Sequence, residues 1–197
     1  MHRISYLLLL IPFASALADA PDPRTRIEER YAAIQRIVLE NDTEEEVQRQ
    51  VVEVLESFTD FHAFSQRTLK SSWADLTEAQ QNLFVDRYRL LIHKSYVKHF
   101  KPNKTLTVTF RTEPRIVGDK ALVQTTVRSG SSSADVDYKL HLRDGNYQAY
   151  DIVIDDVSLM RSYRRQFARI MRDQGFDELI RRINSKIETG NGDVDEP

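Results

Sequence analysis

The stretch from Tyr150 to Ile180, YDIVIDDVSLMRSYRRQFARIMRDQGFDELI, contains the change of periodicity that decides the fold. Its first part alternates apolar and polar residues, which is typical of a β-strand with one buried face. Its second part repeats apolar residues at helical spacing and runs to Gly175, the residue type that most often ends a helix. The sequence therefore predicts a strand, a helix that ends at Gly175, and a last helix that begins near Asp177. The apolar stripe of the first helix is expected at Leu159, Tyr163, Phe167 and Ile170.

Upstream of this stretch the sequence keeps the two-residue period of strands. The alternating segments span about 106–110, 121–127, 136–142 and 146–154. Asp144-Gly145 has the composition of a two-residue hairpin turn. Because short consecutive strands joined by tight turns are typical of antiparallel pairing, we expect about four antiparallel strands.

The N-terminal part instead repeats apolar residues every three to four positions, which predicts helices. They span about 22–41, 43–58, 60–69 and 78–100. Thr43 with Glu46, and Thr77 with Gln80, have the spacing of capping boxes, and Pro102 stops the longest helix. The order of elements predicts an α+β fold, with N-terminal and C-terminal helices packed on one face of an approximately four-stranded antiparallel sheet.

Residues 1–18 have the features of a secretory signal peptide. Arg3 precedes an apolar run from Ile4 to Phe13, which is too short to span a bilayer. Ala16-Leu17-Ala18 then supplies a small-residue cleavage site. We expect a signal peptide over 1–18, one domain over 19–188, an acidic disordered tail over 189–197, and export to the periplasm.

The composition excludes several classes of protein. The chain has 197 residues, no cysteine and a formal net charge of −2. Without cysteine, an exported chain forms no disulfide and depends on its hydrophobic core. The slightly negative charge argues against a nucleic-acid-binding protein, which needs a basic excess.

No catalytic motif is present in the sequence, and no cofactor or metal is expected. The histidines after the leader, each favoured as a core or surface residue, are His62, His93, His99 and His141. Asp151 and Asp155 would lie about 13 Å apart along a strand, too far to share one water or metal. The favoured interpretation is that Asp155 or Asp156 turns or caps the chain before the next helix. Asp151 is then the one credible acid for an enzyme.

Three motifs, in order, resemble a known family. They are FTDFHAFSQRTLKSSWADLTEAQQNLFVDRYRLLIHKSY over 58–96, GNYQAYDIVIDDVSL over 145–159, and YRRQF with GFDELI over 163–167 and 175–180. Together they resemble the MlaC / toluene-tolerance family of periplasmic phospholipid-binding proteins, over about Tyr31 to Ile187. The resemblance implies a carrier that moves a phospholipid across the periplasm and so maintains outer-membrane lipid asymmetry.

The resemblance also implies partners. These are a phospholipid ligand, an outer-membrane lipoprotein–porin complex and an inner-membrane ABC transporter complex of the Mla type, contacted transiently. No covalent chemistry is needed for such a function, so we expect no enzyme. A related branch of the family is associated with hopanoid pathways, which leaves a polycyclic lipid as an alternative cargo.

An apolar pocket between the sheet and the long helix follows from the alternation together with the resemblance. The residues expected to line it and contact lipid are Tyr88, Leu91, Ile92, Tyr96, Tyr138, Leu140, Tyr150, Ile152, Ile154, Val157 and Leu159. A filled core would show the same periodicity, so a structural or adaptor protein and a small periplasmic enzyme remain alternatives.

The arginines of the helix after the last strand fall outside its apolar stripe. They are Arg161, Arg164, Arg165, Arg169 and Arg172. They form either a solvated face balanced by acidic neighbours or a docking surface for acidic partner proteins or lipid headgroups. The pattern does not separate these two interpretations.

Overall fold

The computed structural model describes residues 22–189. The expected signal peptide over 1–18 lies outside the described residues, as does the expected acidic tail apart from Thr189. The described part contains five α-helices, two short 3₁₀-helices and one sheet, and every helix except the last precedes the strands in the sequence. The helices are α1 (Pro23–Glu40), α2 (Glu44–Glu56), α3 (Phe61–Leu69), η1 (Lys70–Trp73), α4 (Glu78–Tyr96), η2 (Val97–His99) and α5 (Leu159–Thr189).

The sheet is antiparallel and has six strands in the order β1-β3-β4-β5-β6, with β2 also paired to β3. The strands are β1 (Leu106–Phe110), β2 (Arg115–Val117), β3 (Lys120–Ser129), β4 (Ser132–Arg143), β5 (Asn146–Ile154) and β6 (Val157–Ser158). The α+β class is confirmed. The sheet exceeds the expected four strands because β2 and β6, of 3 and 2 residues, are too short to show a period.

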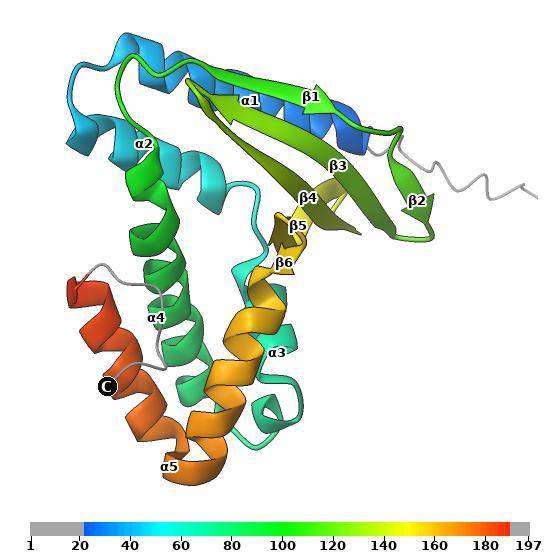
Figure 1. Ribbon diagram of the computed structural model, residues 1–197. Helices are drawn as coiled ribbons and strands as arrows, with labels where there is room; N and C mark the ends of the chain where they lie inside the picture. Colours follow the sequence, from blue (N-terminus) through cyan, green and yellow to red (C-terminus); the bar gives the residue numbers. More distant parts are fainter. Residues whose placement is uncertain (1–21, 190–197) are drawn as a thin grey trace, which may run out of the picture.

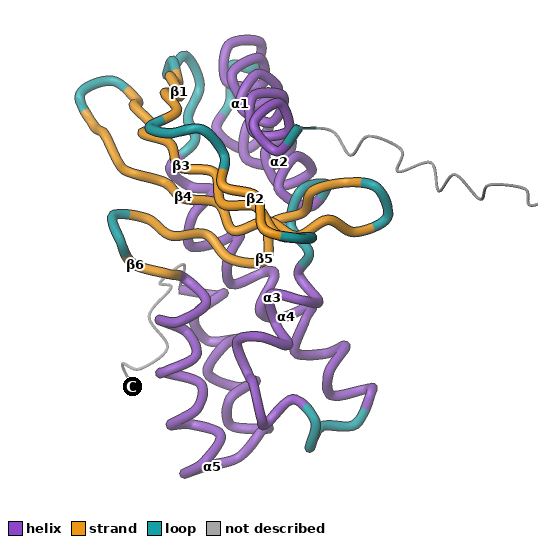
Figure 2. The backbone as a smooth tube through the Cα atoms, turned by 90° about the vertical axis from the view of Figure 1, so that its right-hand side faces the viewer, coloured by secondary structure: helices purple, strands orange, loops and turns teal. Residues whose placement is uncertain are grey.

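The helices cover one side of the sheet (Figures 1 and 2). Helix α1 runs along β1 and β3, and α2 lies beside α1. Helices α3, α4 and α5 form a bundle below the sheet. The bundle joins the sheet where α3 and α5 pack against β5.

Helix α5 is folded back on itself at Gly175, as Figure 1 shows in orange and red. Gly175 has φ 84° and ψ −176°, a backbone conformation that only glycine adopts readily. The two arms of α5 therefore form a helical hairpin, and the break at Gly175 separates them where the sequence predicted one helix to end and the next to begin. The first arm buries Leu159, Tyr163, Phe167 and Ile170, which is the predicted apolar stripe.

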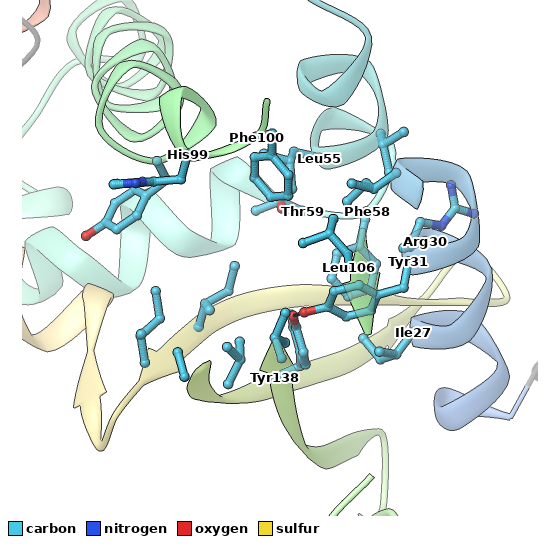
Figure 3. A pocket seen from close by; sticks show the side chains of 18 of the residues that line it. Ile27, Arg30, Tyr31, Leu55, Phe58, Thr59, His99, Phe100, Leu106 and Tyr138 are labelled. Carbon is cyan, nitrogen blue, oxygen red and sulfur yellow. Dashed lines mark hydrogen bonds between the residues drawn. The ribbon is translucent and has the colours of Figure 1, made fainter. Parts of the chain in front are cut away.

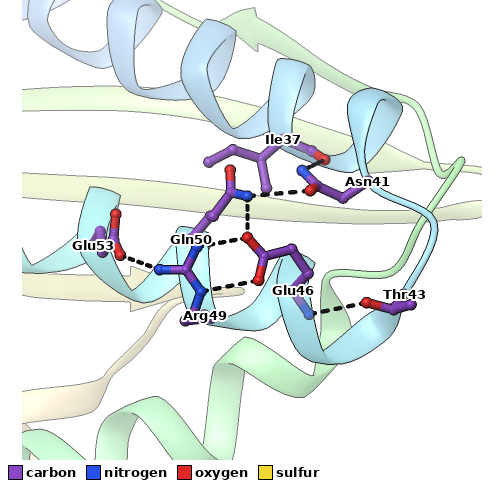
Figure 4. A network of polar contacts seen from close by, with 7 residues as sticks. All are labelled: Ile37, Asn41, Thr43, Glu46, Arg49, Gln50 and Glu53. Atoms are coloured by element: carbon purple, nitrogen blue, oxygen red, sulfur yellow. Dashed lines mark hydrogen bonds and ion pairs between the residues drawn. The ribbon is translucent and has the colours of Figure 1, made fainter.

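The connection between α1 and α2 is held by polar side chains (Figure 4). The Nδ2 of Asn41 donates to the Ile37 carbonyl at 2.9 Å, and the Nε2 of Gln50 donates to the Asn41 Oδ1 at 3.1 Å. Thr43 accepts from the Glu46 amide, but the Glu46 carboxylate turns to Arg49 and Gln50, so only half of the predicted capping box forms. The box at Thr77 and Gln80 is complete.

Three separate hydrophobic clusters make up the interior. One fills the bundle around Phe84, Tyr88 and Phe167. The second joins Ile27 and Phe58 to the sheet residues Tyr138 and Leu140. The third packs α1 against α2. No helix among residues 22–189 is both long enough and apolar enough to cross a membrane.

Candidate functional site

A cavity of about 410 Å³ lies where the sheet, α1 and the top of the helical bundle meet (Figure 3). Its volume falls in the range of about 300–1,000 Å³ that is typical of small-molecule sites. The lining is mainly aliphatic and aromatic. It consists of Ile27, Arg30, Tyr31, Ile34, Val54, Leu55, Phe58, Thr59, Phe61, Phe64, Ile92, Tyr96, His99, Phe100, Leu106, Val127, Ser129, Ser132, Ser133, Ala134, Val136, Tyr138, Ile152, Ile154 and Leu159.

The cavity lies at the junction of the three hydrophobic clusters. The bundle cluster contributes Phe64 and Leu159, the sheet cluster contributes Phe58 and Tyr138, and the cluster of α1 and α2 contributes Ile34. The clusters are therefore arranged around an apolar space instead of merging into one filled core.

One hydrogen bond crosses the apolar wall of the cavity. The hydroxyls of Tyr31 on α1 and Tyr138 on β4 lie 2.5 Å apart, and the two rings meet edge to face (Figure 3). Burial raises the pKa of Tyr31 to about 12 and that of Tyr138 well above its usual value. Both phenols are therefore neutral at physiological pH, and the wall carries no charge at this point.

Part of the cavity lining is polar and exposed. There the lining changes to His99, at the end of η2, and to Ser129, Ser132 and Ser133, around the β3–β4 hairpin. His99, Ser132 and Ser133 are exposed. The cavity is thus a mainly apolar chamber whose exposed mouth carries hydroxyl and imidazole groups, with the guanidinium of Arg30 in the lining contributed by α1; such a chamber suits an amphipathic ligand.

Six of the predicted lining residues are brought together around this cavity. They are Ile92, Tyr96, Tyr138, Ile152, Ile154 and Leu159. Their contact with lipid stays a prediction. They come from α4, β4, β5 and the start of α5, so the pocket does lie between the inner face of the sheet and the long helix, as expected.

The other five lie elsewhere. Tyr88 and Leu91 are fully buried within the bundle cluster, and Leu140 within the sheet cluster. Val157 is 53% exposed on β6. Tyr150 does not line the cavity; the guanidinium of Arg67 on α3 lies 4.2 Å from its ring centroid, and its ring meets that of His141 edge to face.

A β-bulge explains the position of Tyr150. Lys139 pairs with Asp151, but the next residue of β4, Leu140, pairs with Ala149, so Tyr150 has no partner across the ladder. The extra residue shifts the alternation by one position. The expectation that Tyr150 shares a face with Ile152 and Ile154 therefore holds only for the two isoleucines.

Sequence reasoning missed the contribution of the N-terminal half of the chain. Ile27, Tyr31 and Ile34 lie within the helix predicted over about 22–41, and Phe58 and Phe64 lie within the next two predicted helices. The spacing of these residues predicts that they are buried. It does not show whether they line a cavity or pack in a filled core. The sequence around Ser129, Ser132 and Ser133 indicates only a turn, and it does not show that these serines line the mouth of the cavity.

The five predicted docking arginines lie on the first arm of α5, but they are not equivalent. Arg161, Arg165, Arg169 and Arg172 are exposed. Arg164 is half-buried, and its guanidinium donates to the Arg67 carbonyl at 2.6 Å and 3.2 Å. Arg172 pairs with Asp173 at 2.7 Å. Arg164 therefore ties α5 to α3, and docking by the other four stays a prediction.

Asp151, the candidate acid, anchors the start of α5. Its carboxylate is fully buried and accepts from the Ser158 hydroxyl at 2.8 Å, the Met160 amide at 3.2 Å and the Lys139 ammonium at 2.8 Å. It does not line the cavity. Ser158 in turn accepts from the Arg161 amide at 3.1 Å.

The other two aspartates turn the chain before α5, one of the two roles expected of them. Asp155 and Asp156 form the two-residue turn between β5 and β6, with φ of 46° and 65°. Both values are left-handed, as a tight hairpin turn requires.

A second anchor joins α3 to the sheet. Asp60 caps α3 by accepting from the Ala63 amide at 2.8 Å, and it pairs with Arg143 at 2.7 Å and His141 at 3.1 Å. Burial opposes ionisation, but these partners together lower the pKa of Asp60. Among residues 22–189, no group of three or more histidine, aspartate or glutamate residues is placed to hold a metal ion.

The family assignment follows from comparison with known proteins. The model of the MlaC protein family matches residues 27–185. The chain belongs to the MlaC family. The matched region includes all six strands and the cavity. A comparison with curated proteins gives no match.

A protein of known structure has the same fold. It is the phospholipid-binding protein from Ralstonia solanacearum, determined in complex with a phospholipid. The two structures align with a TM-score of 0.77 and 19% sequence identity, over 86% of this chain and 98% of the other. At 19% sequence identity, this structural similarity shows that the two proteins share a fold.

Proposed function

We propose that this protein is a periplasmic carrier that encloses the acyl chains of a phospholipid in the cavity and moves the lipid between membranes. The observation that carries the proposal is the apolar cavity of about 410 Å³ at the junction of the three clusters. Membership of the MlaC family and the fold shared with a phospholipid-binding protein support it.

The energetics of lipid transfer require such an enclosure. Two acyl chains contain roughly 30 methylenes at about 0.8 kcal/mol each, so exposing them to water costs some 20 kcal/mol or more. A lipid cannot cross an aqueous compartment at a useful rate against that barrier. An apolar cavity replaces the hydrocarbon of the bilayer, and the net free energy of transfer becomes small.

The carrier exchanges its lipid with an outer-membrane lipoprotein–porin complex and an inner-membrane ABC transporter complex, and so maintains outer-membrane lipid asymmetry. The exposed arginines of α5 are candidate contacts for acidic surfaces of these partners. Reversing the charge at Arg161 and Arg169 should slow transfer between vesicles that carry the two complexes, while the amount of bound lipid stays unchanged. A loss of bound lipid would count against docking.

A lipid carrier needs no catalytic step, and the position of Asp151 supports a non-enzymatic role. Its carboxylate is occupied by Ser158, Met160 and Lys139 and does not line the cavity. An acid in this position holds the β5–β6–α5 connection and has no access to a ligand in the cavity.

The direct test is native mass spectrometry of the protein purified from the periplasm, followed by solvent extraction and identification of the lipid. The proposal predicts one diacyl phospholipid for each protein chain. A hopanoid or another polycyclic lipid would keep the carrier and change its cargo. A protein that is empty after gentle purification, and that takes up no phospholipid from vesicles, would contradict the proposal.

A further inference from the structure

The cavity lining contains one residue with a permanent charge. Among the described residues that line it, Arg30 of α1 is the only arginine, lysine, aspartate or glutamate. Figure 3 shows Arg30 and His99, which contributes to the exposed mouth, on opposite sides of the cavity. A charge in a mainly apolar wall is unfavourable unless hydrogen bonds or an opposite charge compensate it. The partners of Arg30 therefore indicate what this part of the wall can bind.

The described contacts of Arg30 occupy only part of its guanidinium. Its Nη1 donates to the Ser57 hydroxyl at 2.9 Å, and that hydroxyl donates to the Val54 carbonyl at 2.8 Å. Its Nε is buried and has no hydrogen-bond partner in the described part of the chain. The ion pairs of neighbouring α1 arginines with Glu28 and Glu29 do not include Arg30. Because buried donors in native proteins are nearly always paired, this Nε is a donor available to a ligand.

A second guanidinium adds to the positive charge at this place. The Nη2 of Arg26, one turn earlier on α1, donates to the Ser57 carbonyl at 3.4 Å, so both arginines converge on the residue that caps the C-terminus of α2. Burial and the charge of Arg30 lower the pKa of Arg26, while Glu29, 3.8 Å from its Nη1, opposes them. Two cations with one nearby carboxylate leave an excess of positive charge, which favours an anionic ligand.

The guanidinium of Arg30 lies where the cavity wall meets the surface. Arg30 is half-buried, and its hydrogen-bond partner Ser57 is exposed. A lipid with its acyl chains in the cavity would thus place an anionic oxygen at Arg30 and extend the rest of its headgroup past Ser57 into water. The planar fork of a guanidinium matches two oxygens of a phosphate, so a phosphate is the anion that this site fits best.

We propose that Arg30 binds the phosphate of the lipid whose acyl chains occupy the cavity, and that it fixes the polar end of the lipid at the junction of α1 and α2. The inference rests on the proposed carrier function and adds the residue that recognises the polar end of the cargo. Because the phosphate is common to phospholipids, the site distinguishes a diacyl lipid with a phosphate from one without it. An apolar wall alone does not make this distinction.

The test compares two lipids that differ only in the phosphate. The lipid-free protein is incubated with equimolar palmitoyl-oleoyl phosphatidic acid and the diacylglycerol with the same chains, both delivered from cyclodextrin, and bound lipid is quantified by mass spectrometry. The ratio of bound phosphatidic acid to bound diacylglycerol should be about tenfold higher in the wild type than in Arg30→Gln, the loss of one charge-assisted hydrogen bond. Arg30→Lys keeps the charge but lacks the fork, so its ratio should lie between these two. The lysine variant carries the comparison alone if Arg30→Gln does not fold.

Arg36→Gln is the matched control, because Arg36 is an exposed arginine of the same helix outside the cavity lining. It should keep the wild-type ratio. An unchanged ratio in Arg30→Gln would overturn the phosphate site and leave the carrier function standing. The same holds if the ratio instead falls in the double variant Ser132→Ala and Ser133→Ala, at the mouth. If the wild type retains neither lipid, the carrier function is wrong and the phosphate site falls with it.

A spectroscopic measurement separates direct contact from a structural role, since Arg30 also ties α1 to Ser57. A guanidinium beside the phosphate lowers the second pKa of bound phosphatidic acid. The phosphorus NMR signal should therefore titrate at lower pH in the wild type than in Arg30→Gln. Ser57→Ala, which removes the tether and keeps the guanidinium, should titrate like the wild type. Identical titration in the wild type and Arg30→Gln would contradict direct contact.

A fatty-acid carboxylate is the other source of the same anionic chemistry. Oleate at equal concentration should not displace phosphatidic acid from the wild type, because a single acyl chain buries fewer methylenes in the cavity. Displacement by oleate in the wild type but not in Arg30→Gln would assign the guanidinium to a carboxylate and overturn the phosphate site.

Discussion

The hydroxyl of Tyr31 lies 2.5 Å from the hydroxyl of Tyr138, across the apolar cavity wall from helix α1 to strand β4. The pair joins segments 107 residues apart in the sequence. Tyr138 is 8% exposed, so its hydroxyl depends on this contact. The bond therefore fixes where α1 lies over the sheet, and with it one wall of the cavity.

Removing the Tyr31 hydroxyl alone should cost more than removing both, because Tyr31 also hydrogen-bonds Thr125 whereas Tyr138 bonds Tyr31. Tyr31→Phe leaves the Tyr138 hydroxyl buried without a partner and should lower the free energy of unfolding by about 1–3 kcal/mol. The double variant, with Tyr138→Phe, should recover part of the loss, because no polar group is then stranded. Urea unfolding of the four lipid-free proteins completes the cycle. Additive losses would show that the two hydroxyls are not coupled.

A charge placed on the cavity wall should abolish lipid retention. Ile152 lines the cavity, and an aspartate there would face the acyl chains without a counter-ion, which is strongly unfavourable in an apolar space. We expect Ile152→Asp to be exported and folded but to contain little or no extractable lipid.

Ile116→Asp is the control for this change, because Ile116 is 53% exposed on β2 and remote from the cavity lining. It should retain wild-type lipid, measured by extraction from equal amounts of the two proteins. Normal lipid content in a folded Ile152→Asp protein would remove this residue from the binding site.

Asp151→Asn should separate a structural role from a catalytic one. The change keeps the shape of the side chain but removes the charge that faces the Lys139 ammonium at 2.8 Å. Removing one charge of this buried, hydrogen-bonded ion pair should lower the free energy of unfolding by about 1–3 kcal/mol. Lipid retention and transfer should persist below the new melting temperature. A complete loss of function in a protein that is still folded would instead favour the enzyme alternative.

The stability of the protein should depend on pH through His93. Burial, together with the nearby Arg89, lowers the pKa of His93 to about 4 from 6.5. Since the folded protein favours the neutral imidazole, this contribution to stability is complete above pH 6.5 and is lost as the pH falls toward 4. The thermal midpoint should therefore decline between pH 6.5 and 5.

The variant His93→Gln isolates this effect from other titrations. His93 packs edge to face on Phe61, and its Nε2 lies 3.4 Å from the Glu56 carboxylate. The difference in midpoint between wild type and His93→Gln should shrink as the pH falls from 6.5 to 5. A difference that is constant over this range would mean that His93 has an ordinary pKa in the folded protein.

Local pattern predicted the elements well because each depends on neighbours in the sequence. The helical stripe of α5, the break at Gly175 and the Asp144-Gly145 turn all follow from spacing and residue type. The bulge at Tyr150 could not be predicted in this way, because it is a property of the pairing between β4 and β5. A single unpaired residue then left Tyr150 out of the cavity lining, against Arg67 of α3.

The cavity was harder to predict than the fold for a related reason. Tyr88 and Ile92 lie on one helix and both were expected at the pocket, but a single turn separates a residue within the bundle from a residue at the cavity. The contribution of Ile27 and Tyr31 depends on α1 crossing a sheet that lies far away in the sequence. Periodicity identifies which side of a helix is buried and does not reveal what it is buried against.

The meeting of three hydrophobic clusters around one cavity has a thermodynamic consequence for the proposed carrier. An acyl chain in that space is packed by all three clusters at once, so the cargo serves as the missing centre of the protein interior. Any ligand that binds only the folded state raises its stability in proportion to the logarithm of its concentration. The loaded carrier is then the more robust form, and unloading weakens the attachment of α1 and α2 to the helical bundle. A receptor that takes the lipid must offset the stability that the carrier loses on unloading. Release of the lipid then depends on contact with the receptor.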